Sequence, residues 1–232
     1  MSTPEGPRRR RARRRPLLLG ALLLLLIPVV LWIRPFADDG TPEAFVRWKD
    51  GTVHGPWRSV FDGHGRNGIR DGVIGMRPMA PTRPDETHAG LVVSVARHTD
   101  LDFELETRTI EALRKPKANP WEVSWIVWAY TDPEHFYYLA LKPNGWELGK
   151  RDPAYPGGQR FLKTGHRPFP LGEWYSVKVE QRGAALKVHA DGDELTAFVD
   201  RERPYPSGSV GMYTEDASVE FRDMRLSGRA VS

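Results

Sequence analysis

The chain has 232 residues and a formal net charge of +4 at pH 7, but this charge is unevenly distributed. Residues 1–34 hold eight arginines and one glutamate, so the rest of the chain, with 26 basic and 29 acidic side chains, carries a net charge of −3. A slightly acidic domain lacks the basic face with which proteins bind DNA or RNA, and we expect no nucleic-acid partner. The absence of cysteine excludes disulfides, zinc–thiolate sites and thiol catalysis.

The N-terminal segment joins an arginine-rich arm to an apolar run. Arginine fills seven of the eight positions from 8 to 15, and residues 17–33 carry no charge. A helix of that length spans roughly 25 Å, near the lower limit for crossing a membrane. We expect a cytoplasmic arm over 1–16 and a transmembrane signal anchor over 17–34, with the C-terminal part extracytoplasmic at the cell membrane. A cleaved signal peptide is the alternative, although proline in Pro35-Phe36-Ala37 makes a poor cleavage site.

Residues 35–55 are polar and contain glycine and proline, which predicts a linker. From Trp57 onward, apolar or alternating runs are separated by turn-forming groups such as Pro143-Asn144-Gly145 and Asp191-Gly192-Asp193. These runs predict thirteen strands, namely Trp57–Phe61, Val73–Arg77, Ala89–Arg97, Leu101–Glu111, Glu122–Thr131, Phe136–Lys142, Glu147–Lys150, Arg160–Lys163, Trp174–Gln181, Ala185–Ala190, Glu194–Val199, Ser209–Tyr213 and Ser218–Ser227. The sequence therefore predicts an all-β, two-sheet antiparallel jelly-roll sandwich over residues 56–230, preceded by one N-terminal transmembrane helix.

The order of motifs in the second half of the chain resembles that of a known superfamily. The motifs are WAYTDPEHFYYLALKPNGWELGKRD, the hairpin LGEWYSVKVEQRGAALKVHADGDEL, and the closing SGSVGMYTEDASVEFRDMRL. They are similar to the concanavalin A-like lectin/glucanase superfamily, and within it to laminin-G-like domains and to the 3-keto-disaccharide hydrolase, or family-16-glycoside-hydrolase-like, domains of bacteria. The resemblance implies two curved antiparallel sheets, with a concave face that often holds a glycan. Because fold does not determine function, the site must be argued from its own residues.

Catalytic carboxylates are only weakly indicated. Retaining glucanases of the family-16 type carry Glu-x-Asp-x-x-Glu on one strand, which sets two carboxyls about 5 Å apart. Asp102, Glu104 and Glu106 share one strand face here, but the central aspartate and the second glutamate are missing. These acids are interpreted as the solvent face of a strand, and a relocated pair such as Glu104 with Glu122 stays open.

Aromatic residues give a stronger indication of a ligand site. Eight of them fall within 26 positions: Trp121, Trp125, Trp128, Tyr130, Phe136, Tyr137, Tyr138 and Trp146. Flat rings stack on sugar faces and so hold neutral glycans. From strand alternation we expect Val123, Trp125 and Val127 to face the core. This leaves Trp128, Tyr130, Tyr138 and Lys150 as candidate ligand-binding residues, unless both faces of the strand are buried.

The superfamily resemblance also allows a calcium ion, for which Asp62 and Asp223 stand at the matching positions. Structural turn aspartates are the alternative, and no cofactor is required. No pair of histidines has zinc-ligand spacing. Residues 63–68 are glycine-rich but lack the lysine of a phosphate loop, so we expect a plain loop there.

Three functions remain open from the sequence. The first is a membrane-anchored, lectin-like domain that binds a glycan or polysaccharide. The second is a glycoside hydrolase-like enzyme of the 3-keto-disaccharide hydrolase type. The third is a protein-interaction sandwich without a small-molecule site. The clustered aromatics favour the first two, and the missing catalytic triplet favours the first over the second.

Overall fold

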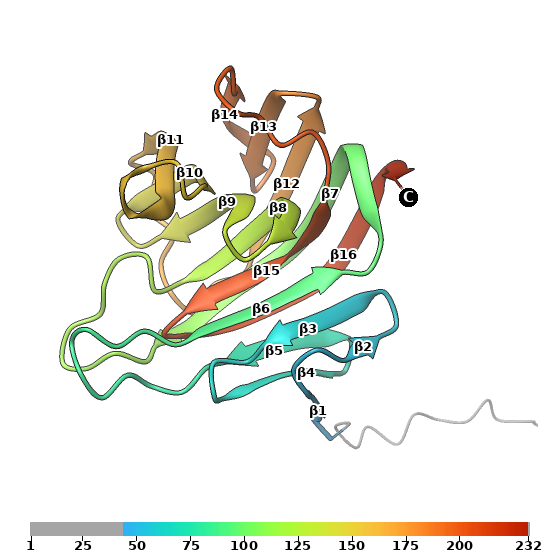
Figure 1. Ribbon diagram of the computed structural model, residues 1–232. Coiled ribbons are helices and arrows are strands. Elements are labelled where there is room, and N and C mark those ends of the chain that lie inside the picture. The colour runs from blue at the N-terminus through green and yellow to red at the C-terminus, as the bar shows by residue number, and fades with distance from the viewer. Residues whose placement is uncertain (1–43, 232) are drawn as a thin grey trace, which may run out of the picture. The chain divides into compact units, whose positions relative to one another are not determined.

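The computed structural model describes residues 44–231, and most of these lie in strands (Figure 1). Within this range no helix combines the length and apolar character needed to span a membrane. The arm and anchor predicted at residues 1–34 lie outside the described residues.

Two eight-stranded antiparallel sheets make up the described part of the chain, which confirms the predicted two-sheet architecture. Sheet A has the order β1 (Val46–Trp48), β4 (Arg66–Arg70), β5 (Val73–Arg77), β16 (Ala217–Val231), β7 (Arg97–Ala112), β12 (Tyr175–Arg182), β13 (Ala185–Ala190), β14 (Asp193–Val199). Sheet B has the order β11 (Gln159–Gly165), β10 (Gly145–Arg151), β9 (His135–Lys142), β8 (Ser124–Asp132), β15 (Ser209–Glu215), β6 (Ala89–Ser94), β3 (Trp57–Phe61), β2 (Val53–His54). A short 3₁₀ turn, η1 (Pro156–Gly158), joins β10 to β11.

Each of the thirteen predicted strands overlaps an observed strand, but three strands were not predicted. β1 and β2 lie inside the segment predicted to be a linker, so the sandwich begins earlier than expected. β4 overlaps the predicted loop at 63–68. Its Gly68 is required because a Cβ there would stand 2.3 Å from the carbonyl oxygen of Val46 on the paired strand. A strand that contains such a glycine lacks the apolar alternation by which strands are recognised.

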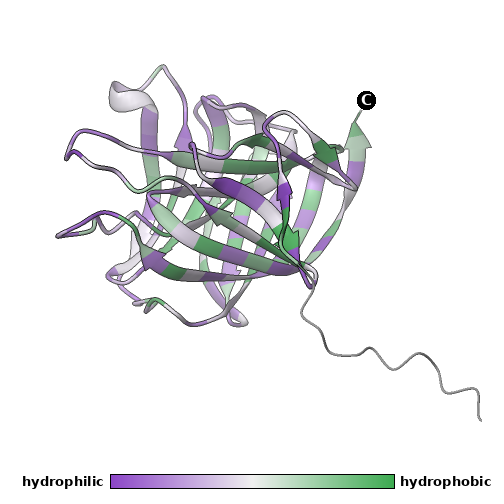
Figure 2. Cartoon of the chain, turned by 90° about the horizontal axis from the view of Figure 1, so that it is seen from below, coloured by the Kyte–Doolittle hydropathy of each residue, from purple (hydrophilic) through white to green (hydrophobic). Residues whose placement is uncertain are grey.

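The main core lies between the sheets, because it joins Phe103, Val179 and Phe221 of sheet A to Ile126 and Trp128 of sheet B. The alternating green and purple segments in Figure 2 follow from this arrangement, since successive side chains of a strand point to opposite faces. A second apolar cluster consists of residues of sheet B together with Val123, which directly precedes β8, and lies on the face turned away from sheet A. Its members are Leu91, Val93, Val123, Trp125, Val127, Phe136, Tyr138 and Ala140. Sheet B is thus buried on both faces along its middle strands.

The parity predicted for β8 was therefore wrong. Ile126 and Trp128 point between the sheets, while Trp125 and Val127 point outward. A bulge at Ala129, whose φ of 50° is left-handed, then shifts the alternation and brings Tyr130 to the outward side.

Candidate functional site

The outer face of sheet B, turned away from sheet A, carries charged groups at the borders of its apolar cluster. In register across the sheet, Glu147 of β10 pairs with Ala140, Ala140 with Trp125, and Trp125 with Tyr213 of β15. Residues paired in this way project on the same side, so the four side chains form one row. The row places a carboxylate and a tyrosine on opposite sides of Trp125.

Three rings form the centre of this face. Trp125 packs against Tyr138 with ring centroids 4.4 Å apart, and meets Tyr213 edge-on at 5.2 Å. Trp125 and Tyr138 are buried, whereas Tyr213 is half-buried. The Trp125 Nε1 donates to the backbone carbonyl of Trp121 at 2.8 Å, and the Trp121 side chain is 45% exposed. The face has a buried, well-fixed base, and of its three rings only that of Tyr213 is partly exposed and available for stacking.

Glu147 is fixed at one border of the face by two contacts. The Tyr138 hydroxyl donates to its Oε1 at 2.7 Å, and Lys142 Nζ lies 2.7 Å from its Oε2. Gln159 in turn donates from Nε2 to the Tyr138 hydroxyl. Burial, and then the charge of Glu147, raise the pKa of Tyr138, so its hydroxyl remains a donor at neutral pH. Glu147 and Tyr138 thus form a pre-positioned polar pair.

This pair depends on the absence of a side chain at Gly149, which is the register partner of Tyr138. A Cβ at Gly149 would stand 2.2 Å from the Tyr138 hydroxyl oxygen and 2.4 Å from its Cζ. Both separations are far below van der Waals contact. The tyrosine ring can therefore cross β10 and reach Glu147 only because residue 149 is glycine.

Glu215, at the end of β15, forms the other border. The Tyr213 hydroxyl donates to its Oε1 at 2.6 Å, while Oε2 has no hydrogen-bond partner among residues 44–231. Burial raises the pKa of the Glu215 carboxyl, opposed in part by the Tyr213 hydrogen bond and by the nearby charge of Arg151. A carboxyl with a raised pKa beside accessible rings is typical of functional sites.

Together these groups suit a hydroxyl-rich ligand. The free oxygen of Glu215 can accept a hydrogen bond from a ligand hydroxyl. The Arg151 guanidinium, whose charge reaches both Tyr213 and Glu215, can donate one. The half-buried ring of Tyr213 supplies ring surface. Small-molecule sites commonly combine aromatic side chains with a few polar groups that fix the orientation of the ligand.

The predicted ligand-binding residues do not form the expected platform. Trp128 is fully buried between the sheets, and its prediction as a groove residue was wrong because the parity of β8 was reversed. Tyr138 points to the outer face but is also fully buried, so it supports the site without being accessible. Tyr130 is half-buried on the outer face.

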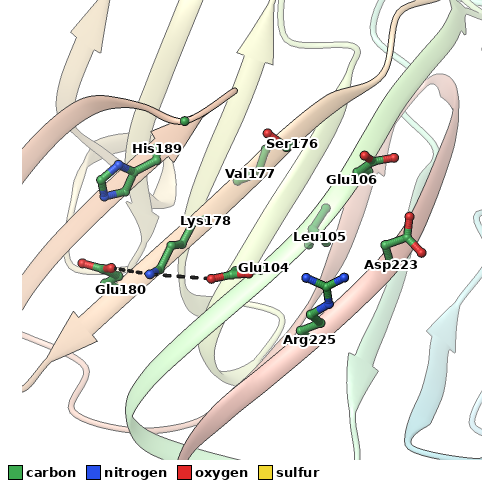
Figure 3. A pocket seen from close by; sticks show the side chains of 11 residues that line it. Glu104, Leu105, Glu106, Ser176, Val177, Lys178, Glu180, His189, Asp223 and Arg225 are labelled. Carbon is green, nitrogen blue, oxygen red and sulfur yellow. Dashed lines mark ion pairs between the residues drawn. The ribbon is translucent and has the colours of Figure 1, made fainter.

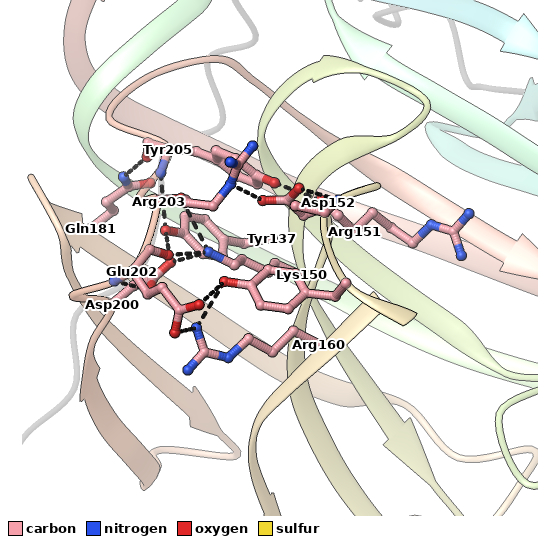
Figure 4. A network of polar contacts seen from close by, with 12 residues as sticks. Tyr137, Lys150, Arg151, Asp152, Arg160, Gln181, Asp200, Glu202, Arg203 and Tyr205 are labelled. Carbon is pink, nitrogen blue, oxygen red and sulfur yellow. Dashed lines mark hydrogen bonds and ion pairs between the residues drawn. The ribbon is translucent and has the colours of Figure 1, made fainter. Parts of the chain in front are cut away.

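Lys150 is also buried and points inward with Leu148. Its Nζ lies 2.8 Å from Asp200 Oδ2 and donates to the backbone carbonyls of Glu202 and Arg203 (Figure 4). The Tyr137 hydroxyl donates to the same Asp200 oxygen at 2.7 Å. Every donor of the ammonium group is therefore satisfied within the protein, and the prediction of Lys150 as a ligand contact is corrected to a structural ion pair.

The two candidate catalytic glutamates are not brought together. Glu104 lies on the outer face of sheet A, in a pocket of about 490 Å³ where Lys178 stands between Glu104 and Glu180 (Figure 3). Glu122 precedes β8 and is buried against Arg114 and Asn119. The proposed pair of Glu104 and Glu122 is thus not assembled.

The two candidate calcium ligands are likewise separate. Asp62 follows β3 and accepts a hydrogen bond from Arg47 at 2.9 Å, whereas Asp223 is exposed in β16 and lines the sheet A pocket. In the stretch from 44 to 231, no group of three or more histidine, cysteine, aspartate or glutamate side chains is placed to hold a metal ion.

Glu147, Tyr213 and Glu215 were not predicted from the sequence. Tyr213 and Glu215 stand two positions apart in β15, which places an aromatic ring and a carboxyl on one face, but the strand predicted from the sequence ended at Tyr213. That spacing was a usable signal. Glu147 could not be found in this way, because its partner Lys142 lies across the β9–β10 turn. Whether either residue can contact a ligand depends on which face of sheet B is open, and the sequence does not show this.

Solved structures share this arrangement of sheets. The carbohydrate-binding module CBM66 from Bacillus subtilis is 15% identical, with a TM-score of 0.55, over 75% of this chain and 96% of that chain. A Bacillus subtilis protein of unknown function with a galectin-like fold is 12% identical, with a TM-score of 0.55, over 76% and 90%. A structure described as a native glycosidic hydrolase is 9% identical, with a TM-score of 0.52, over 78% and 94%. At such identities the likeness shows the fold alone.

The chain is a sandwich of the concanavalin A-like superfamily. More narrowly, residues 37–227 match the family of 3-keto-alpha-glucoside-1,2-lyase-like domains, and the chain belongs to that family. The sequence matches no curated protein.

Proposed function

We propose that this protein is a membrane-tethered, extracytoplasmic domain that binds a carbohydrate on the outer face of sheet B. The observation that carries the proposal is the row of contacts from Glu147 through Trp125 and Tyr213 to Glu215. It combines the half-buried ring of Tyr213 with a carboxylate oxygen that has no partner in the described part of the chain. Family membership supports a sugar as the ligand. The tether rests on the apolar run at residues 17–33.

The binding test uses the full chain in detergent micelles and a panel of oligosaccharides measured by calorimetry. Glu215→Gln keeps the shape of the side chain but replaces a charged acceptor by a neutral one. Hydrogen bonds to charged groups contribute about 1.5–3 kcal/mol, so we expect roughly 10- to 100-fold weaker binding. Glu104→Gln on sheet A is the matched control and should bind as the wild type does. A loss of binding in the control alone would move the site to the pocket of sheet A.

A second function, an elimination reaction on a 3-keto-glucoside, is favoured by one specific observation: burial raises the pKa of Glu215. A carboxylate with a raised pKa is a stronger base. It could remove the proton from C2, which the neighbouring ketone acidifies. The electron pair then forms the C1–C2 double bond as the C1–O bond breaks, and the same carboxyl can return the proton to the leaving oxygen.

The reaction is tested by incubating the full chain with a 3-keto-α-glucoside and measuring the released aglycone. Glu215→Gln should lower kcat by at least about 100-fold, since general-base catalysis contributes 10²- to 10⁴-fold. Binding without any release of aglycone in the wild type would leave carbohydrate binding as the function and reject the lyase.

A further inference from the structure

A pocket opens on the outer face of sheet B, at the end away from Glu215. It has a volume of about 280 Å³, and its polar lining consists of Arg58, Arg97, Tyr130, Thr131 and serine side chains. The lining contains no aspartate or glutamate. The pocket adjoins the proposed carbohydrate face, because Val93 and Tyr130 belong to the apolar cluster of that face.

Arg58 and Arg97 have no carboxylate partner within the described part of the chain, although arginine is usually paired there. Arg47, Arg77, Arg108, Arg114, Arg182 and Arg222, for example, each contact an acidic side chain. Two guanidinium groups that share a pocket repel each other unless an anion lies between them. The lining of the pocket thus carries two exposed positive charges and no negative one, and the nearest acidic group is Asp132, beside Tyr130.

Tyr130 reaches this pocket because of the bulge in β8. Ala129 is held at a left-handed φ of 50°, and Gly208 packs against the bulge so closely that a Cβ there would stand 2.3 Å from the Ala129 carbonyl carbon. Such strained backbone is retained where it aims a side chain. The Tyr130 hydroxyl has no hydrogen-bond partner among residues 44–231. Burial, and then the charge of Asp132, raise its pKa, and the charge of Arg58 opposes that shift, so Asp132 and Arg58 both lie close to the ring. Tyr130 therefore offers a free donor beside the two arginines.

We propose that Arg58, Arg97 and Tyr130 form an anion-binding subsite of the carbohydrate face, so that the saccharide bound is an acidic one with carboxylate or sulfate groups. Guanidinium groups bind both kinds of anion through paired N–H donors. This inference rests on the proposed function. It adds that a neutral sugar ring occupies the Tyr213 and Glu215 end while a charged group of the same molecule lies near Arg58.

The test measures the affinity of the full chain in detergent micelles for hexagalacturonate and for its fully methyl-esterified, uncharged form. Dextran sulfate and dextran oligosaccharides form a second pair, which separates carboxylate from sulfate recognition. In at least one pair we expect the charged member to bind about tenfold tighter or more. Arg58→Gln with Arg97→Gln should abolish this preference without weakening the uncharged member.

Arg201→Gln with Arg225→Gln is the matched control, because it removes the same charge from exposed arginines elsewhere and should preserve the preference. Equal affinity within both pairs, or a preference that survives the Arg58 and Arg97 substitutions, would overturn the subsite and leave carbohydrate binding intact. If no oligosaccharide of either pair binds the wild type, the proposed function and the subsite both fail.

Discussion

Replacing Lys150 by methionine should destabilise the sandwich strongly, because it breaks a sealed ion pair. Methionine keeps most of the apolar stem but removes the ammonium group. Asp200 is then left buried, 1% exposed, with only the Tyr137 hydroxyl and the Glu202 amide as donors, and the carbonyls of Glu202 and Arg203 lose theirs. Breaking a buried pair from one side costs about 3–5 kcal/mol, since a charge remains uncompensated.

For a domain of this size each kcal/mol lowers the melting temperature by roughly 2–4 °C, so a decrease of about 6–20 °C is expected. Urea denaturation and calorimetry of the Lys150→Met chain measure both quantities. Lys178→Met is the control, because Lys178 lies partly in solvent beside Glu104 and Glu180, and such solvated pairs contribute at most about 1 kcal/mol. Adding Asp200→Asn to Lys150→Met should restore part of the loss, since it removes the stranded charge.

A Lys150→Met chain within 1 kcal/mol of the wild type would refute this reasoning, because it would show that the buried ammonium group contributes no more than an exposed one. So small an effect is what a solvent-exposed Lys150 would give, and an exposed Lys150 could contact a ligand.

Three further predictions follow from the buried rings and carboxyls. Trp128→Ala should cost about 3–5 kcal/mol by opening a cavity between the sheets, whereas Trp128→Phe, which also removes an unpaired N–H, should cost clearly less; below its melting temperature each variant should retain ligand affinity. Gly149→Ala should displace the Tyr138 ring, cost about 1–3 kcal/mol and weaken oligosaccharide binding, as urea denaturation and calorimetry would show; because Gly149 does not have a left-handed φ, the cost comes from the clash with Tyr138 and not from backbone strain. Because burial raises the pKa of Glu215, the free energy of unfolding should fall as pH rises from about 4.5 through the folded-state pKa. Glu215→Gln lacks this titration, so urea denaturation should show its stability increasing relative to the wild type across that interval. A difference in unfolding free energy that does not change with pH would contradict the assignment.

Most strands could be predicted because, in a strand with one buried face, apolar and polar residues alternate along the sequence. In β12, Val177 and Val179 are buried while Ser176 is exposed and Lys178 and Glu180 lie partly in solvent, as their positions predict. The pattern fails in β8, where Trp125, Ile126, Val127 and Trp128 are all apolar and nothing local distinguishes the inner face from the outer. A strand whose side chains are apolar and buried on both faces of the sheet has no alternation from which its inner face could be predicted.

The site was harder to predict because its residues obtain their roles from distant partners. Lys150 looks like a groove residue until Asp200, fifty positions along the chain, is seen beside it. The alternation of β8 was predicted with the wrong parity, yet Tyr130 does lie on the outer face. The reason is that the bulge at Ala129 shifts the alternation by one residue just before Tyr130. Glu215 combines a local partner, Tyr213, with a buried position that depends on the packing of the whole sheet.

Gly149 has an implication for how variation in this protein should be interpreted. It has no side chain to touch a sugar, yet the space above its Cα is occupied by the Tyr138 ring on its way to Glu147. In a saturation screen for ligand binding, every substitution at position 149 should weaken binding as a substitution of a ligand contact does. Only the native glycine should be fully tolerated. An inventory of ligand contacts would omit Gly149, although the shape of the face depends on it.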